Sequence, residues 1–149
     1  MATPLIPLEE RLFRMDANMP VLLGSRCDAC EISYWPVRRR CAVCHAPAGT
    51  VDLSGTGTLH SYTFVHVPWF GKSQMDSAGY GVGQIDLPEG VRIQCVIGGD
   101  PESWRIDMPM QISHTIVDER DDADVALFEF VPAAPGDDPG GDPGGDNDA

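Results

Sequence analysis

The sequence predicts a mainly β protein in which a small zinc ribbon precedes a five-stranded barrel of the OB type. Two observations carry this prediction. Two Cys-x-x-Cys pairs, Cys27 with Cys30 and Cys41 with Cys44, have ten residues between them, which is the spacing of two facing metal knuckles. After Val51 the chain changes to short apolar runs separated by turn residues, without a helical period.

Residues 1–20 are predicted to contain one short amphipathic helix. From Leu5 to Met19, apolar residues recur at every third or fourth position with charged residues between them. Pro20 is expected to end the helix. So short a helix is not stable alone in water, so its apolar stripe is expected to pack on the rest of the protein or on a partner.

The zinc ribbon is expected over residues 21–50. Four thiolates, from Cys27, Cys30, Cys41 and Cys44, complete a tetrahedral site that leaves no position for water or substrate, so the Zn²⁺ is predicted to be structural. A disulfide pair and a redox Cys-x-x-Cys are the alternatives; both are disfavoured, because no signal peptide precedes the cysteines and a redox motif would be single. His45 is expected to be an exposed loop residue rather than a ligand.

Two features lie between the cysteine pairs. Tyr34 and Trp35 are expected to cover one face of the small metal module, which has no core of its own. Arg38, Arg39 and Arg40 form the only basic cluster in a chain of net charge −13. Such a run is usually a solvated face, but guanidinium groups match phosphate well, so a phosphate-binding role is the alternative interpretation.

The barrel is expected over residues 51–132. Its five predicted strands cover residues 57–67, 80–87, 91–97, 109–117 and 125–131. The sequence Leu-Pro-Glu-Gly-Val at 87–91 predicts a hairpin turn, and a short helical turn is expected near 102–104. Five strands with a long break after the third are typical of a small closed barrel, and a sandwich is the alternative.

Two segments of the chain are expected to be irregular. The loop 68–79 carries Trp69, Phe70 and Lys72, which predict either an interface or a loop that folds back over the barrel mouth. Residues 133–149 repeat Pro-Gly-Asp and hold no apolar side chain larger than alanine. They are therefore expected to form a disordered acidic tail.

Composition limits the function classes. The acidic balance opposes binding to nucleic-acid backbones, which attract lysine and arginine. No apolar run reaches the length of about 20 residues that a membrane-spanning helix needs, so a cytoplasmic protein is expected.

The chain offers few candidates for catalysis. Cys95 lies in an apolar strand and is expected to be a buried, inert thiol. His60 and His66 are predicted to flank Tyr62 on one face of the first barrel strand, and His114 supports no special role. We therefore expect a protein that is not catalytic by itself.

Several runs of the sequence resemble the DUF35 family. They are Leu-Gly-Ser-Arg-Cys at 23–27, the second cysteine pair, Leu-Ser-Gly-Thr-Gly-Thr-Leu-His-Ser-Tyr-Thr at 53–63, and the strands near 90–93 and 106–110. The resemblance implies an N-terminal helix, a rubredoxin-like zinc ribbon and an OB-fold. It also implies an accessory subunit that docks on a thiolase-fold enzyme, either a thiolase or a steroid side-chain aldolase, and helps to bind an acyl-CoA substrate.

The resemblance leaves several points open. A MaoC-type hydratase is a further possible partner, and the chain could be native or a fragment of a fusion. Chemistry, rather than the family motif, places Arg38, Arg39, Arg40 and Lys72 near the CoA phosphates. Trp69 and Phe70 are assigned in the same way to the partner or acyl surface. A module that binds single-stranded nucleic acid is the competing hypothesis.

Overall fold

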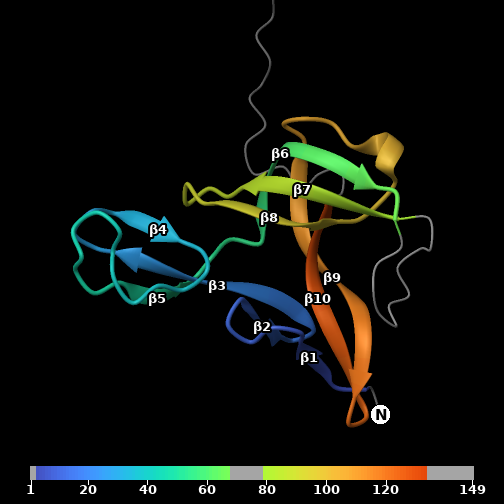
Figure 1. Ribbon diagram of the computed structural model, residues 1–149, viewed down its shortest axis with the longest axis horizontal. Coiled ribbons are helices and arrows are strands. Elements are labelled where there is room, and N and C mark those ends of the chain that lie inside the picture. The colour runs from blue at the N-terminus through green and yellow to red at the C-terminus, as the bar shows by residue number, and fades with distance from the viewer. Residues whose placement is uncertain (1–2, 68–78, 134–149) are drawn as a thin grey trace, which may run out of the picture.

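The computed structural model describes residues 3–67 and 79–133, so the predictions for Trp69, Phe70, Lys72 and the acidic tail lie outside the described residues. Five strands form a closed barrel (Figure 1). They are β6 (Thr56–Val65), β7 (Tyr80–Asp86), β8 (Arg92–Ile97), β9 (Pro109–Arg120) and β10 (Ala123–Pro132). The five strands predicted from the sequence are confirmed.

The barrel closes through a Greek-key order of strands. Neighbours follow the order β10-β8-β7-β6-β9, and β9 pairs with β10 to complete the circle. All of these pairs are antiparallel except β10 with β8, which meet in parallel where Phe130 lies opposite Ile97. The break after β8 holds a short 3-10 helix, Pro101–Ser103, close to the predicted helical turn. This is the architecture of a small OB-type barrel.

The predicted N-terminal helix is wrong. The segment instead forms β1 (Leu5–Pro7), β2 (Phe13–Asp16) and the start of β3 (Met19–Cys27). β1 pairs in parallel with β10, and β2 forms a hairpin with β3. Among the described residues there is no helix long and apolar enough to cross a membrane.

Local backbone geometry explains why the helix is not formed. Ala17 and Asn18 both have positive φ, 47° and 65°, between paired Asp16 and Met19. This is the conformation of a two-residue hairpin turn of the type that asparagine favours. Pro20, expected to stop a helix, lies buried within β3 opposite Met15. The helical spacing of apolar residues therefore coincides with strands, of which β2 and β3 contribute Phe13 and Leu22 to the core.

The long strand β3 connects the barrel region to the ribbon. Its first half pairs with β2, and its second half pairs on either side with β4 (Ile32–Tyr34) and β5 (Gly49–Asp52). Figure 1 shows this small sheet projecting to one side of the barrel. Gly24 permits the tight packing, because a Cβ atom there would lie 2.5 Å from the carbonyl oxygen of Tyr34.

An aromatic cluster holds the N-terminal hairpin and the ribbon on the barrel. The Phe128 ring of β10 makes edge contacts with Phe13 of β2, at a centroid distance of 5.3 Å, and with Trp35, at 5.7 Å. Trp35 Nε1 also donates to the carbonyl oxygen of Leu12 at 3.1 Å. Trp35, which the sequence predicts to cover one face of the metal module, therefore packs against the barrel.

This cluster predicts a large effect of one substitution. Phe128→Ala should lower the free energy of unfolding by about 3–5 kcal/mol, because it removes a buried ring and leaves a cavity between three elements. Urea unfolding followed by circular dichroism would measure the change. The neighbouring Leu127→Ala, at a partly exposed position, is the control. A loss for Phe128→Ala no greater than that of the control would contradict the role given to the cluster.

Candidate functional site

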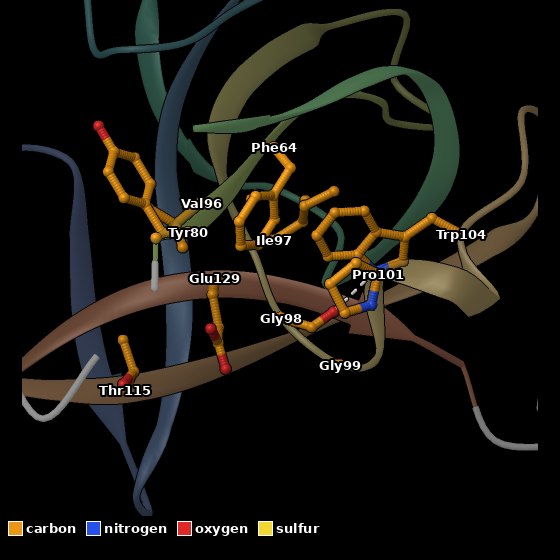
Figure 2. Close-up of a pocket in the computed structure, with 12 residues that line it drawn as sticks. Phe64, Tyr80, Val96, Ile97, Gly98, Gly99, Pro101, Trp104, Thr115 and Glu129 are labelled. Carbon is orange, nitrogen blue, oxygen red and sulfur yellow. Dashed lines mark hydrogen bonds between the residues drawn. The ribbon is translucent and has the colours of Figure 1, made fainter. Parts of the chain in front are cut away.

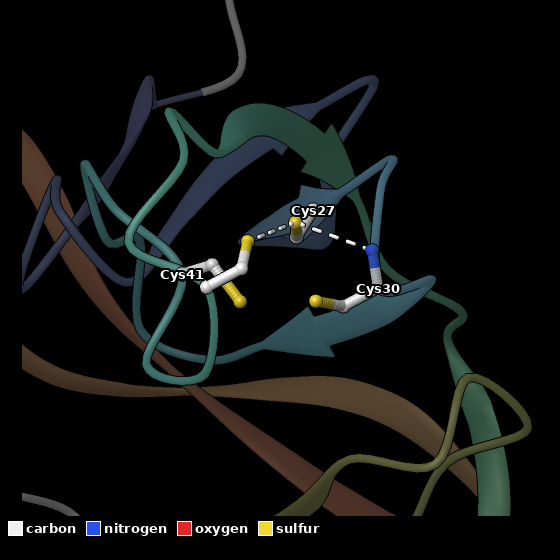
Figure 3. A group of neighbouring side chains, drawn as sticks. Cys27, Cys30 and Cys41 are labelled. Atoms are coloured by element: carbon white, nitrogen blue, oxygen red, sulfur yellow. Dashed lines mark hydrogen bonds between the residues drawn. The ribbon is translucent and has the colours of Figure 1, made fainter.

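The structure brings the four cysteines of the two pairs together in one cluster. Their Sγ atoms all lie within 4.8 Å of one another, and Cys27 Sγ is 3.5 Å from Cys44 Sγ. Figure 3 shows the sulfurs of Cys27, Cys30 and Cys41 facing a common centre. A disulfide would require a separation of about 2.05 Å. Tetrahedral Zn²⁺ with bonds of about 2.3 Å would place its sulfurs about 3.8 Å apart, so the cluster fits a four-thiolate metal site.

Backbone turns present these sulfurs to the centre. The amide of Cys30 points at Cys27 Sγ at 3.5 Å, and the amide of Val43 points at Cys41 Sγ at 3.4 Å. Glu31 and His45, which follow the two pairs, both adopt positive φ, 56° and 62°. The left-handed conformation closes each turn although neither residue is glycine. The His45 imidazole does not belong to the cluster, and its backbone joins the turn by donating from N to Cys41 O.

Tyr34 supports the cluster from outside. Its hydroxyl oxygen lies 3.3 Å from Cys41 Sγ and accepts the amide of Ala42 at 3.1 Å. This hydrogen bond from Tyr34, together with nearby backbone amides, lowers the pKa of Cys41 to about 6. The contact with Cys44 and burial raise the pKa of Cys30 to about 12. Four thiolates this close repel one another, and a bound divalent cation would remove that repulsion.

The three arginines of the ribbon have different environments. The Arg38 guanidinium lies over the Tyr34 ring, 4.9 Å from its centroid, and the Arg38 amide donates to Ser25 Oγ at 2.6 Å. Arg40 Nη1 donates to the carbonyl oxygen of His45 at 2.8 Å and so braces the second knuckle. Arg39 is exposed, and its side chain has no partner within the described residues. Their role as a phosphate site stays a prediction.

A pocket at the barrel was missed by the sequence analysis. It has a volume of about 290 Å³ and is lined by residues from all five barrel strands and from the segment after β8 (Figure 2). Burial raises the pKa of Glu129, a pocket residue on β10. The only signal in the sequence was a single carboxylate within the apolar run of β10. The sequence of β10 alone does not show which residues of the other strands line the pocket.

The fifth cysteine, on β8, and His114, on β9, lie in separate environments. Burial, and then the nearby Glu129, raise the pKa of Cys95 to about 12, so this thiol is unreactive at neutral pH. The Nδ1 atom of His114 is buried and has no hydrogen-bond partner among the residues that the structure describes. In residues 3–67 and 79–133 no hydrogen bond joins a histidine side chain to a serine, threonine or cysteine side chain.

The prediction that His60 and His66 flank Tyr62 on one face of the first barrel strand is wrong. The register of β6 against β7 shifts between Leu59 and Ser61, which makes His60 a bulge residue. His60 Nδ1 lies 3.5 Å from Asp86 Oδ2 and 3.2 Å from Arg92 Nη2 on the outer surface. His66 lies beyond the end of β6, with its ring against Phe64.

Comparisons with known proteins agree with both parts of the chain. Residues 18–48 match the family model described as "ChsH2, rubredoxin-like zinc ribbon domain", and residues 50–115 match "ChsH2, C-terminal OB-fold domain". A "DUF35 domain-containing scaffold protein" of Methanothermobacter thermautotrophicus is 30% identical over 116 residues, covering 74% of this chain and 86% of the relative. The chain belongs to the DUF35 family.

Two other matches have names that refer to enzymes. "Benzoylsuccinyl-CoA thiolase subunit BbsA" of Thauera aromatica is 32% identical over 117 residues, covering 77% of this chain and 78% of BbsA. A solved structure described as "Ltp2-ChsH2(DUF35) aldolase" matches with a TM-score of 0.62 and 29% identity. The match covers 76% of this DUF35 chain and 86% of that chain.

The contact between Tyr34 and Cys41 makes metal retention in this DUF35 chain testable. Tyr34→Phe should weaken Zn²⁺ binding by about 10–100-fold, because the variant loses a hydrogen bond that stabilises the thiolate. Competition with a chelator of known affinity would measure the change. Tyr62→Phe is the control, because it loses a hydroxyl that bonds to Trp104 O in the barrel. Equal Zn²⁺ affinity in the two variants would remove Tyr34 from the metal site.

Proposed function

We propose that the chain is a noncatalytic accessory subunit that docks on a thiolase-fold enzyme and helps to bind its acyl-CoA substrate. The observation that carries the proposal is the match of ribbon and barrel to the two ChsH2 family models, together with two relatives whose names refer to enzymes. One of those relatives is named as a subunit of a thiolase, and the other is described with Ltp2 as an aldolase. The metal is proposed to be structural Zn²⁺ held by Cys27, Cys30, Cys41 and Cys44.

Two features of the chain support a noncatalytic role. The four thiolates would saturate a tetrahedral ion, so no open position would be available to activate water or substrate. Outside this cluster, Cys95 is the one other cysteine, and its thiol is buried with a raised pKa. The catalytic groups are therefore proposed to belong to the partner. A MaoC-type hydratase as a second partner rests on the family resemblance alone.

The ribbon arginines support a contact with the CoA phosphates. Arg39 is exposed with its guanidinium available, and Arg38 is held in place beside it by the Tyr34 ring. Arg40 is committed to the knuckle, so we assign it a supporting role. Guanidinium groups bind phosphate oxygens through paired hydrogen bonds. Lys72 is proposed to assist, and Trp69 and Phe70 to contact the partner or the acyl group, on chemistry alone.

The nucleic-acid hypothesis finds little support on the barrel surface. β7 and β8 carry Gln84 and Asp86 on partly exposed positions and Gln94 on an exposed one. The single arginine of β7 and β8, Arg92, is paired with Asp86 at 2.6 Å. A groove that follows a nucleic-acid backbone would require unpaired cations beside stacking aromatics.

Co-expression tests the proposed docking. The chain should copurify at equal stoichiometry with a thiolase-like protein of its source genome, and light scattering on the eluted complex should give the combined mass. The complex, and not the chain alone, should bind CoA. Failure of every thiolase-like protein of that genome to copurify would overturn the proposal.

The phosphate contact can be tested in the same complex. Arg39→Glu should weaken CoA binding by about five- to tenfold, because a negative carboxylate that repels the phosphates replaces an exposed guanidinium. Isothermal titration with CoA at fixed ionic strength would measure this change. Arg120→Glu, at the exposed end of β9, controls for the change in net charge. Equal weakening by both variants would exclude a specific phosphate site at Arg39.

A further inference from the structure

The pocket on the barrel has two chemically different walls. In Figure 2 the aromatic rings of Phe64 and Trp104 lie on one side, and the carboxylate of Glu129 lies across from them with Thr115 nearby. Val96 and Ile97 complete the apolar side. The volume of about 290 Å³ corresponds to the space of about ten water molecules, so the pocket can hold a long side chain or a small ligand.

Two glycines create this space. A Cβ atom on Gly98 would lie 2.9 Å from Glu129 Oε2, so a side chain there would displace the carboxylate. A Cβ atom on Gly81 would lie 2.2 Å from the Trp104 ring, so only glycine lets the indole lie against β7. The positions of the carboxylate and of the aromatic wall therefore both depend on the absence of a side chain.

The polar groups around the pocket favour a ligand that is a hydrogen-bond donor or a cation. Trp104 Nε1 already donates to Gly98 O at 3.0 Å, so the indole does not offer its N–H to a ligand. Among the described residues that line the pocket there is no lysine, arginine or histidine. In the part of the chain that the structure describes, the Glu129 carboxylate has no hydrogen bond or ion pair. Burial disfavours the charged form of this acid and raises its pKa, and a cation beside it would offset that cost.

We propose that this pocket receives an arginine side chain from the protein partner. The inference rests on the proposed function, since it concerns the surface by which the subunit docks. A planar guanidinium can stack on the aromatic wall while its N–H groups reach the carboxylate in a paired arrangement. Arginine in a desolvated pocket is also a frequent source of binding energy at protein interfaces. The net charge of −13 favours association with a basic surface.

The pocket is separate from the proposed phosphate site. It lies where β7 begins, at Tyr80, whereas the ribbon projects beyond the far end of that strand (Figure 1). Its carboxylate would also repel the phosphates of CoA. The two ends of the molecule would thus take charges of opposite sign, with anions at the ribbon arginines and a cation at Glu129.

Titration of the isolated chain with arginine amide tests the pocket directly. Amide resonances of Phe64, Val96 and Gly98 should shift in a saturable manner in two-dimensional NMR spectra. Citrulline amide, which has nearly the same shape without the charge, should bind about tenfold more weakly or worse. Glu129→Gln should reduce arginine amide binding to a similar degree, and Glu119→Gln, at an exposed position, should leave it unchanged.

Three results of this titration would overturn the inference. They are equal binding of the arginine and citrulline amides, equal binding by wild type and Glu129→Gln, and binding that is seen only in a Lys72→Ala variant. The last result would mean that a lysine of the same chain fills the pocket.

Copurification distinguishes this inference from the proposed function. Glu129→Gln should recover about tenfold less partner than wild type at limiting concentration, while Glu119→Gln recovers the wild-type amount. Equal recovery with Glu129→Gln would overturn the inference alone. Failure of the wild-type chain to recover any thiolase-like partner would overturn the proposed function, and the inference with it.

Discussion

The edge contacts of Phe128 with Phe13 and Trp35 determine how the parts of this protein are arranged. The N-terminal hairpin and the ribbon are each too small to bury a core, so both rely on the barrel for apolar surface. The Phe128 ring of β10 contacts both of them. The Trp35 indole also donates a hydrogen bond to the carbonyl oxygen of Leu12, in the segment before β2. The ribbon is thereby fixed on the barrel instead of being attached as a separate module on a linker.

The cysteine cluster extends this fixed geometry to the ribbon surface. Tyr34 contacts Cys41 through its hydroxyl and Arg38 through its ring, while the Arg38 amide is held by the buried Ser25. Arg40 in turn braces the second knuckle. A metal at the cluster would therefore orient the arginine run although no arginine touches it. In this sense a structural ion can contribute to binding without taking part in chemistry.

The parts of the fold that were predicted correctly depend on local patterns. Cysteine spacing and alternating strands can be recognised within short windows, so the ribbon cluster and the five barrel strands were found. The helix error arose because β1 is stabilised by β10, more than a hundred residues away, and no local signal reports that pairing. The Glu129 pocket was missed for the same reason, since its walls come together only when the barrel closes. The bulge at His60 interrupts the alternation of inward and outward side chains along β6, and nothing in the sequence marks that interruption.

The parallel pairing of β1 with β10 has a consequence for biosynthesis. Leu5, Ile6 and Pro7 lie opposite Asp124, Val125 and Ala126, so almost the whole described chain must leave the ribosome before β1 can pair. The four cysteines and the strands around them all lie within the first 52 residues, and they can collect their metal much earlier. Folding during synthesis would thus begin at the ribbon and finish when β10 pairs with β1, which has left the ribosome long before.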